Sequence, residues 1–125
     1  MVTNGDDTGD GKDLTTLDGT SWTLVEGTGV TTPNDVSLTL QLEDGRVSGS
    51  GGCNRFTSSY EEEGNSISFG SVASTRMACP DEIMSAERAY LAALGSAAWW
   101  SASGNELVLS DSSGEELLRY ESPTA

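Results

Sequence analysis

Residues 37–50, SLTLQLEDGRVSGS, decide what kind of fold the rest of the chain can adopt. Their three leucines alternate with polar residues, which is the pattern of a strand with one buried face and one solvated face. Asp44-Gly45 is a strong signal for a two-residue hairpin turn. Residues 46–48 supply the return strand, and the glycine-rich residues 49–52 indicate a flexible connection after it. This stretch therefore predicts an antiparallel hairpin.

Short strands bounded by turn residues continue on both sides of this hairpin. Turns are indicated where glycine stands beside aspartate, asparagine or serine. The whole pattern predicts about seven strands. Besides the hairpin, the strand candidates are Ser21–Val25, Ser66–Phe69, Ala98–Ser101, Glu106–Leu109 and Leu117–Tyr120.

One helix is predicted from Pro80 to Gly95. Pro80 suits the first helical position, and the two acidic residues after it complement the positive end of the helix dipole. Apolar residues then fall on one stripe, and Gly95 closes the segment. The stripe also contains Glu87, whose carboxylate needs a partner or contact with water. Its apolar members are Ile83, Met84, Tyr90, Leu91 and Leu94.

The charge balance excludes several classes of partner. The chain has 125 residues, 20 acidic and 6 basic side chains, and a net charge of −14. Such a surface repels phosphate backbones and anionic membranes, so we expect no nucleic-acid partner. A chain this acidic suits a salt-rich environment, in which ions screen its self-repulsion, and it equally suits an ordinary acidic secreted protein.

Two cysteines and no histidine narrow the chemistry further. Zinc sites need about four ligands, and the usual Ser-His and Cys-His nucleophile pairs need histidine, so we expect no metal, no cofactor and no catalytic residue. Cys53 and Cys79 form either a structural disulfide or two buried free thiols. We expect the disulfide because the chain is small and rich in turns, which places it outside the reducing cytosol. In the chain-entropy model this bridge contributes about 3–4 kcal/mol.

Residues 1–16 are predicted to be a disordered acidic linker, and residues 17–125 the folded domain. The linker has no signal-peptide pattern, so we expect a signal or lipid-attachment site to have been removed ahead of Met1. Three of its positions alternate as in the first half of an EF-hand loop, but the bidentate glutamate at the end is missing. A solvated linker is therefore favoured over a calcium site. The three positions are Asp6, Thr8 and Asp10.

Two motifs bring the cysteines into a recognisable setting. They are GGCNRF at residues 51–56 and STRMACP at residues 74–80. With LDGTSW at 17–22, ISFG at 67–70 and LVL at 107–109 in the same order, the chain resembles the META domain family, also called the heat-shock protein HslJ-like family. Besides the cysteines, the motif positions are Gly52, Asn54, Thr75, Met77 and Tyr90.

This resemblance implies an α+β fold, in which a curved antiparallel sheet like a partly open barrel packs against one helix. It also implies an envelope-associated or secreted protein, often a lipoprotein, with links to stress and secretion. The family provides no established biochemical activity and no catalytic residues to transfer.

A disulfide would bring Arg55 and Arg76 into one neighbourhood, because each stands close to a cysteine. Two interpretations are open. The arginines pair inside the protein, with Glu87 as the obvious acidic partner, or they form an exposed site for a carboxylate or phosphate.

Trp99-Trp100 falls in a strand candidate, so the two rings point to opposite faces and at least one belongs to the core. The exposed ring is a weaker candidate for a binding platform.

Two functional hypotheses remain. The first is a non-catalytic accessory domain of the cell envelope or exterior that binds a protein, peptide or lipid through the sheet face or barrel mouth. The second is a structural or stress-protective lipoprotein module without a ligand site. We expect a monomer in either case.

Overall fold

The computed structural model describes residues 16–32 and 36–122. Nearly all of the expected acidic linker, with its calcium-like positions Asp6, Thr8 and Asp10, lies outside these residues. The described part of the chain contains nine strands and one helix. In order, they are β2 (Thr20–Gly27), β3 (Thr39–Glu43), β4 (Arg46–Ser50), β5 (Arg55–Glu63), β6 (Ser66–Phe69), β7 (Ala73–Ser74), α1 (Asp81–Ser96), β8 (Trp99–Ser103), β9 (Glu106–Ser110) and β10 (Glu116–Glu121).

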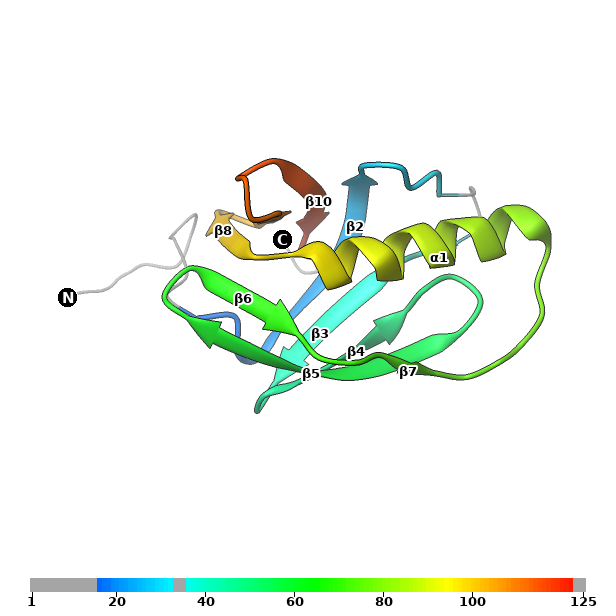
Figure 1. Ribbon diagram of the computed structural model, residues 1–125, viewed down its shortest axis with the longest axis horizontal. Helices are drawn as coiled ribbons and strands as arrows, with labels where there is room; N and C mark the ends of the chain where they lie inside the picture. Colours follow the sequence, from blue (N-terminus) through cyan, green and yellow to red (C-terminus); the bar gives the residue numbers. More distant parts are fainter. Residues whose placement is uncertain (1–15, 33–35, 123–125) are drawn as a thin grey trace.

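The strands form an antiparallel barrel around one core. The sheet runs in the order β4-β3-β2-β10-β9-β8-β6-β5-β7, and a further pairing of β4 with β5 closes it. The ring therefore contains eight of the nine described strands. β7 pairs with β5 on the side away from β4, beyond the end of β6. Figure 1 shows α1 lying across this sheet, in front of β2 and β3. The predicted α+β class with one packed helix is confirmed, and the barrel is closed rather than partly open.

The predicted hairpin around Asp44-Gly45 is present as β3 and β4. Asp44 and Gly45 both have positive φ, 55° and 78°, as a two-residue type I′ turn requires. The three alternating leucines before the turn are all buried in the core. The expected flexible connection begins later than predicted, because β4 continues through Gly49 to Ser50.

The longest strand, β5, was not among the predicted strands. Its inward positions carry Phe56, Ser58, Tyr60 and Glu62, so two of the four are polar. Ser58 is buried and its hydroxyl donates to the Gly70 carbonyl at 2.9 Å. The carboxylate of Glu62 accepts the Leu17 N–H at 3.1 Å. Internal partners therefore allow polar side chains on a face where sequence patterns look for apolar ones.

The helix supplies a large part of the core on one side of the barrel. Tyr90 is fully buried, its hydroxyl donates to the Thr39 carbonyl at 2.9 Å, and the Tyr120 hydroxyl donates to it at 3.1 Å. Its ring meets Phe56 edge-on, with centroids 6.0 Å apart. The barrel interior is thus filled by side chains. The largest fully buried ones include Tyr90, Tyr120, Phe56, Leu94, Leu107, Leu109 and Leu118.

The two neighbouring tryptophans divide as the strand pattern predicts. Trp100 is buried, and its indole N–H donates to the Gly64 carbonyl at 3.1 Å. Trp99 lies on the outer face of β8 and is 47% exposed.

Gly49 permits the close approach of β3 and β4. A Cβ at this position would collide with the Thr39 carbonyl and would stand 3.1 Å from the Phe56 ring. Gly49→Ala is therefore expected to lower the free energy of unfolding by about 1–3 kcal/mol. Gly95→Ala is the matched control, because nothing lies within 4 Å of its Cβ position and alanine favours a helix. Chemical denaturation measures both, and equal stability of the two variants would contradict the packing argument.

The buried tyrosines predict a loss of stability in alkali. Burial raises the pKa of Tyr90 and of Tyr120 well above the ordinary value. Below about pH 10 the folded and unfolded states keep these hydroxyls protonated, and above it only the unfolded chain loses the protons. The free energy of unfolding should therefore fall as the pH rises above about 10.

Denaturation midpoints measured between about pH 8 and pH 11 test this expectation. Tyr120→Phe should be less stable at neutral pH because it loses the hydroxyl pair, and its further loss in alkali should be smaller than that of the parent chain. An identical alkaline slope in the two proteins would contradict the assignment.

Candidate functional site

The cysteine motifs meet where the helix joins the barrel. Cys53 and Cys79 form a disulfide with Cα atoms 6.0 Å apart, as expected from the sequence. Cys53 follows the end of β4, and Cys79 precedes Pro80, which is the N-cap of α1. The bond therefore fixes the start of the helix to the rim of the barrel.

A buried carboxylate lies directly beside this bond. Glu87 is 6% exposed, and its Oε2 accepts the N–H groups of Cys53 at 3.2 Å and Asn54 at 2.6 Å. Its Oε1 accepts the Asn54 side-chain amide at 2.8 Å. These donors compensate for removing the carboxylate from water, since hydrogen bonds to a charged group are among the stronger ones.

Asn54 passes this interaction on to the segment before the helix. Its Oδ1 accepts the Thr75 hydroxyl at 2.9 Å and the Met77 N–H at 2.6 Å. Thus one asparagine holds the helix through its amide and the approaching chain through its carbonyl. We call Asn54, Glu87, Thr75, the Met77 backbone and the disulfide the Asn54 clasp.

Two glycines of the first motif make room for the clasp. A Cβ at Gly51 would stand 2.7 Å from Cγ of Glu87, so a side chain at 51 would displace the carboxylate. Gly52 has φ +110°, which side-chain-bearing residues rarely adopt. The motif positions expected from the sequence therefore converge on one place, with Tyr90 one turn further along the helix.

The predicted ion pair of Arg55 or Arg76 with Glu87 is wrong. Both arginine side chains are exposed, and the donors on Glu87 come from residues 53 and 54. The physical reason is strand alternation, which turns Asn54 inward and Arg55 outward. Arg76 belongs to an extended exposed segment. Both side chains are exposed, as the second interpretation requires, and neither makes an ion pair with any residue in the described ranges.

This exposed segment, residues 70–78, forms a strap between β6 and the start of α1. Every residue of the strap is exposed, and it contains β7. It carries two of the four large apolar side chains that the described chain exposes, Val72 at 37% and Met77 at 57%. Figure 1 shows the chain leaving β7 and turning back to reach the start of α1.

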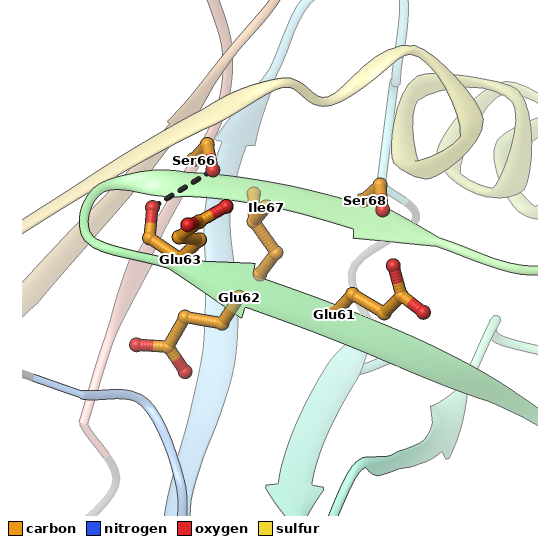
Figure 2. A pocket seen from close by; sticks show the side chains of 6 residues that line it. All are labelled: Glu61, Glu62, Glu63, Ser66, Ile67 and Ser68. Atoms are coloured by element: carbon orange, nitrogen blue, oxygen red, sulfur yellow. Dashed lines mark hydrogen bonds between the residues drawn. The ribbon is translucent and has the colours of Figure 1, made fainter.

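A hollow of about 530 Å³ lies at the other end of β5, between the Glu61-Glu62-Glu63 run and the start of β6. Figure 2 shows that the carboxylates of Glu61 and Glu62 point away from each other. The Glu62 carboxylate accepts a hydrogen bond from the Leu17 N–H, and the Ser66 hydroxyl donates to the backbone carbonyl of Glu63. The three carboxylates do not converge on a common point. Across residues 16–32 and 36–122, no cluster of three acidic or cysteine side chains could hold a metal ion.

The sequence patterns did not reveal the Asn54 clasp. The motif positions Asn54, Thr75 and Met77 were identified only by resemblance, without a physical role. The signal that was available was Glu87 itself, because a carboxylate on an apolar helix stripe requires several donors. The expected partner was a cation, whereas the side-chain donor is the amide of Asn54.

Taken together, the fold and the clasp define a small disulfide-braced antiparallel barrel with one docked helix. The family model described as META domain matches residues 15–124. The chain therefore belongs to the META domain family. No curated protein matches the sequence. No helix within the described ranges has the length and apolar character needed to cross a membrane.

Three solved structures share this architecture. A protein from Burkholderia xenovorans, solved by NMR, is 29% identical, with a TM-score of 0.72 over 87% of this chain and 85% of its own. A DUF4847 family protein from Bacteroides vulgatus is 14% identical, with a TM-score of 0.65 over 84% and 93% of the two chains. A third protein, also solved by NMR, is 20% identical, with a TM-score of 0.63 over 83% and 89%. The last two likenesses concern the fold alone.

The buried position of Glu87 predicts which substitutions will destabilise the domain. Glu87→Gln places an amide donor against N–H donors and should lower the free energy of unfolding by about 1–3 kcal/mol. Glu61→Gln, an exposed change on β5, is the matched control. Arg55→Ala and Arg76→Ala should leave stability nearly unchanged, because neither side chain contacts Glu87. Thermal or urea denaturation tests the set. A large loss of stability in an arginine variant would support an ion pair between that arginine and Glu87.

Proposed function

We propose that the chain is a non-catalytic accessory domain of the cell envelope or exterior that binds a protein or peptide through its outer surface. The observation that carries this proposal is the contrast between a filled barrel and an exposed strap. Tyrosines and leucines occupy the interior, so the barrel has the packing of a core rather than that of a carrier cavity. The mouth of the barrel, one of the two locations expected for a ligand, is thereby disfavoured, and so is a lipid.

The strap has the composition of a contact surface. Methionine and arginine are enriched where proteins bind partners. The strap itself carries the exposed side chains of Val72, Arg76 and Met77, and Arg55 lies on the neighbouring strand β5, in a molecule with a net negative charge. The Asn54 clasp holds this segment against the barrel without burying it, so its contact groups are fixed in advance. Pre-arranged groups bind with a smaller entropy cost.

The disulfide supports a location outside the reducing cytosol. A lipid anchor on the N-terminal side of residue 16 would be compatible with this placement, because the strap belongs to the folded barrel and would remain available to partners. Periplasm, cell surface and medium are all oxidising enough to maintain such a bond.

Photo-crosslinking in the native host tests the proposal. A photo-reactive residue in place of Met77 should give one discrete adduct with a partner protein after illumination. The matched control is the same residue in place of Val25, which is 55% exposed but lies on β2, away from the strap. No adduct at position 77, or equal adducts at both positions, would contradict the proposal. The first outcome would favour a structural module without a ligand site.

A further inference from the structure

The strap presents an open strand edge. β7 pairs with β5 on one side, with Phe56 opposite Ser74 and Thr57 opposite Ala73. No other strand in the described ranges pairs with β7, which is the terminal strand of the sheet order. Figure 1 places β7 beside β5, with the connection to α1 continuing from it. The free side of β7 is therefore a sheet edge rather than part of the closed ring.

The direction of the backbone groups along the strap is set by two hydrogen bonds. The Thr75 N–H donates to the Arg55 carbonyl at 3.0 Å, and the Met77 N–H donates to Oδ1 of Asn54 at 2.6 Å. Residues 75 and 77 thus direct their N–H groups toward the barrel. Alternate residues of an extended chain direct them to opposite sides. Ser74 and Arg76 consequently present their N–H groups to the free edge.

This edge is only partly protected against pairing. Exposed edges are normally blunted by very short strands, charged side chains, proline or a covering element, and β7 has two residues with the charged Arg76 close by. The strap contains neither proline nor lysine, and all of its residues are exposed. What it does carry is Arg76, with Arg55 opposite Thr75 on the neighbouring strand. Two guanidinium groups without an acidic partner in the described chain favour a partner that supplies carboxylates.

Charge also decides between a second copy and a different partner. Each chain has a net charge of −14, so two copies meeting at any face repel each other over the whole molecule. A short acidic peptide segment avoids most of this repulsion and meets the two arginines directly. Val72 and Met77 flank the edge and offer apolar contacts to alternate side chains of an added strand.

We propose that β7 receives an extended acidic peptide segment as an added strand, paired to the backbone of Ser74 and Arg76 and held by Arg55 and Arg76. Main-chain hydrogen bonds supply the affinity in this mode of recognition, and the flanking side chains supply the specificity. The inference rests on the proposed function, since it specifies how the outer surface takes its partner.

Two short peptides test the pairing directly. One alternates glutamate with threonine and valine, and the other has lysine in place of glutamate. Amide NMR of the folded domain should show the glutamate peptide shifting the Ser74 and Arg76 signals and slowing their hydrogen exchange. The lysine peptide should bind there at least tenfold more weakly. Absence of any effect at these amides up to millimolar peptide, or equal binding of both peptides, would overturn the proposal.

Variants separate the backbone contribution from that of charge. Ser74→Pro removes an N–H that faces away from β5, so the domain should keep its fold and lose the peptide. Arg76→Glu should weaken the glutamate peptide at least tenfold and improve the lysine peptide. Arg88→Glu, an equal charge change at an exposed helix position, is the matched control and should change neither.

The same variants distinguish failure of this inference from failure of the proposed function. With the photo-reactive residue at position 77, both Ser74→Pro and Arg76→Glu should abolish the adduct formed in the host. An adduct that survives both changes would reject strand addition while leaving a surface-binding domain. If the protein with only the photo-reactive residue at position 77 gives no adduct, the proposed function is rejected as well.

Discussion

The buried carboxylate of Glu87 is the interaction on which the arrangement of helix and barrel depends. It lies 6% exposed beneath the disulfide and accepts three hydrogen bonds from residues 53 and 54. Removing a charge from water is costly, so this geometry is stable only when all its donors are in place. Glycine at 51, the backbone turn at 52 and asparagine at 54 are therefore required together. The GGCN motif is best understood as the receptor for one glutamate, and the disulfide as the covalent support beside it.

The sequence was sufficient for the elements that follow simple periodicity. The hairpin at Asp44-Gly45, the helix after Pro80 and the division of Trp99 from Trp100 all follow from alternation, turn chemistry or dipole rules. The disulfide followed from the small size of the chain and its richness in turns. β5 could not be found this way, because its inward serine and glutamate are satisfied by partners distant in the sequence. Closure of the ring depends on β5 pairing with β4, so missing that strand also meant missing the closed barrel.

The partner of Glu87 shows a different limit of sequence reasoning. An acidic residue on an apolar stripe correctly indicated a buried interaction, and a cation was the natural candidate. Backbone N–H groups carry no sequence signal of their own, yet two of the three donors on this carboxylate are of that kind. Arg55 and Arg76 were thereby released to the surface, in a molecule that otherwise presents mainly negative charge. Asn54, and not an arginine, is the side-chain partner of Glu87.

The position of the disulfide has a consequence for how the molecule withstands damage. Exposed segments of extended chain are where proteases cut most readily. The strap is such a segment, and it lies within the loop that the bond closes between Cys53 and Cys79, which stand 26 positions apart. A single cut anywhere in the strap therefore leaves two fragments joined covalently, with β5 and β6 on one and α1 on the other. The bond therefore keeps a nicked molecule in one piece.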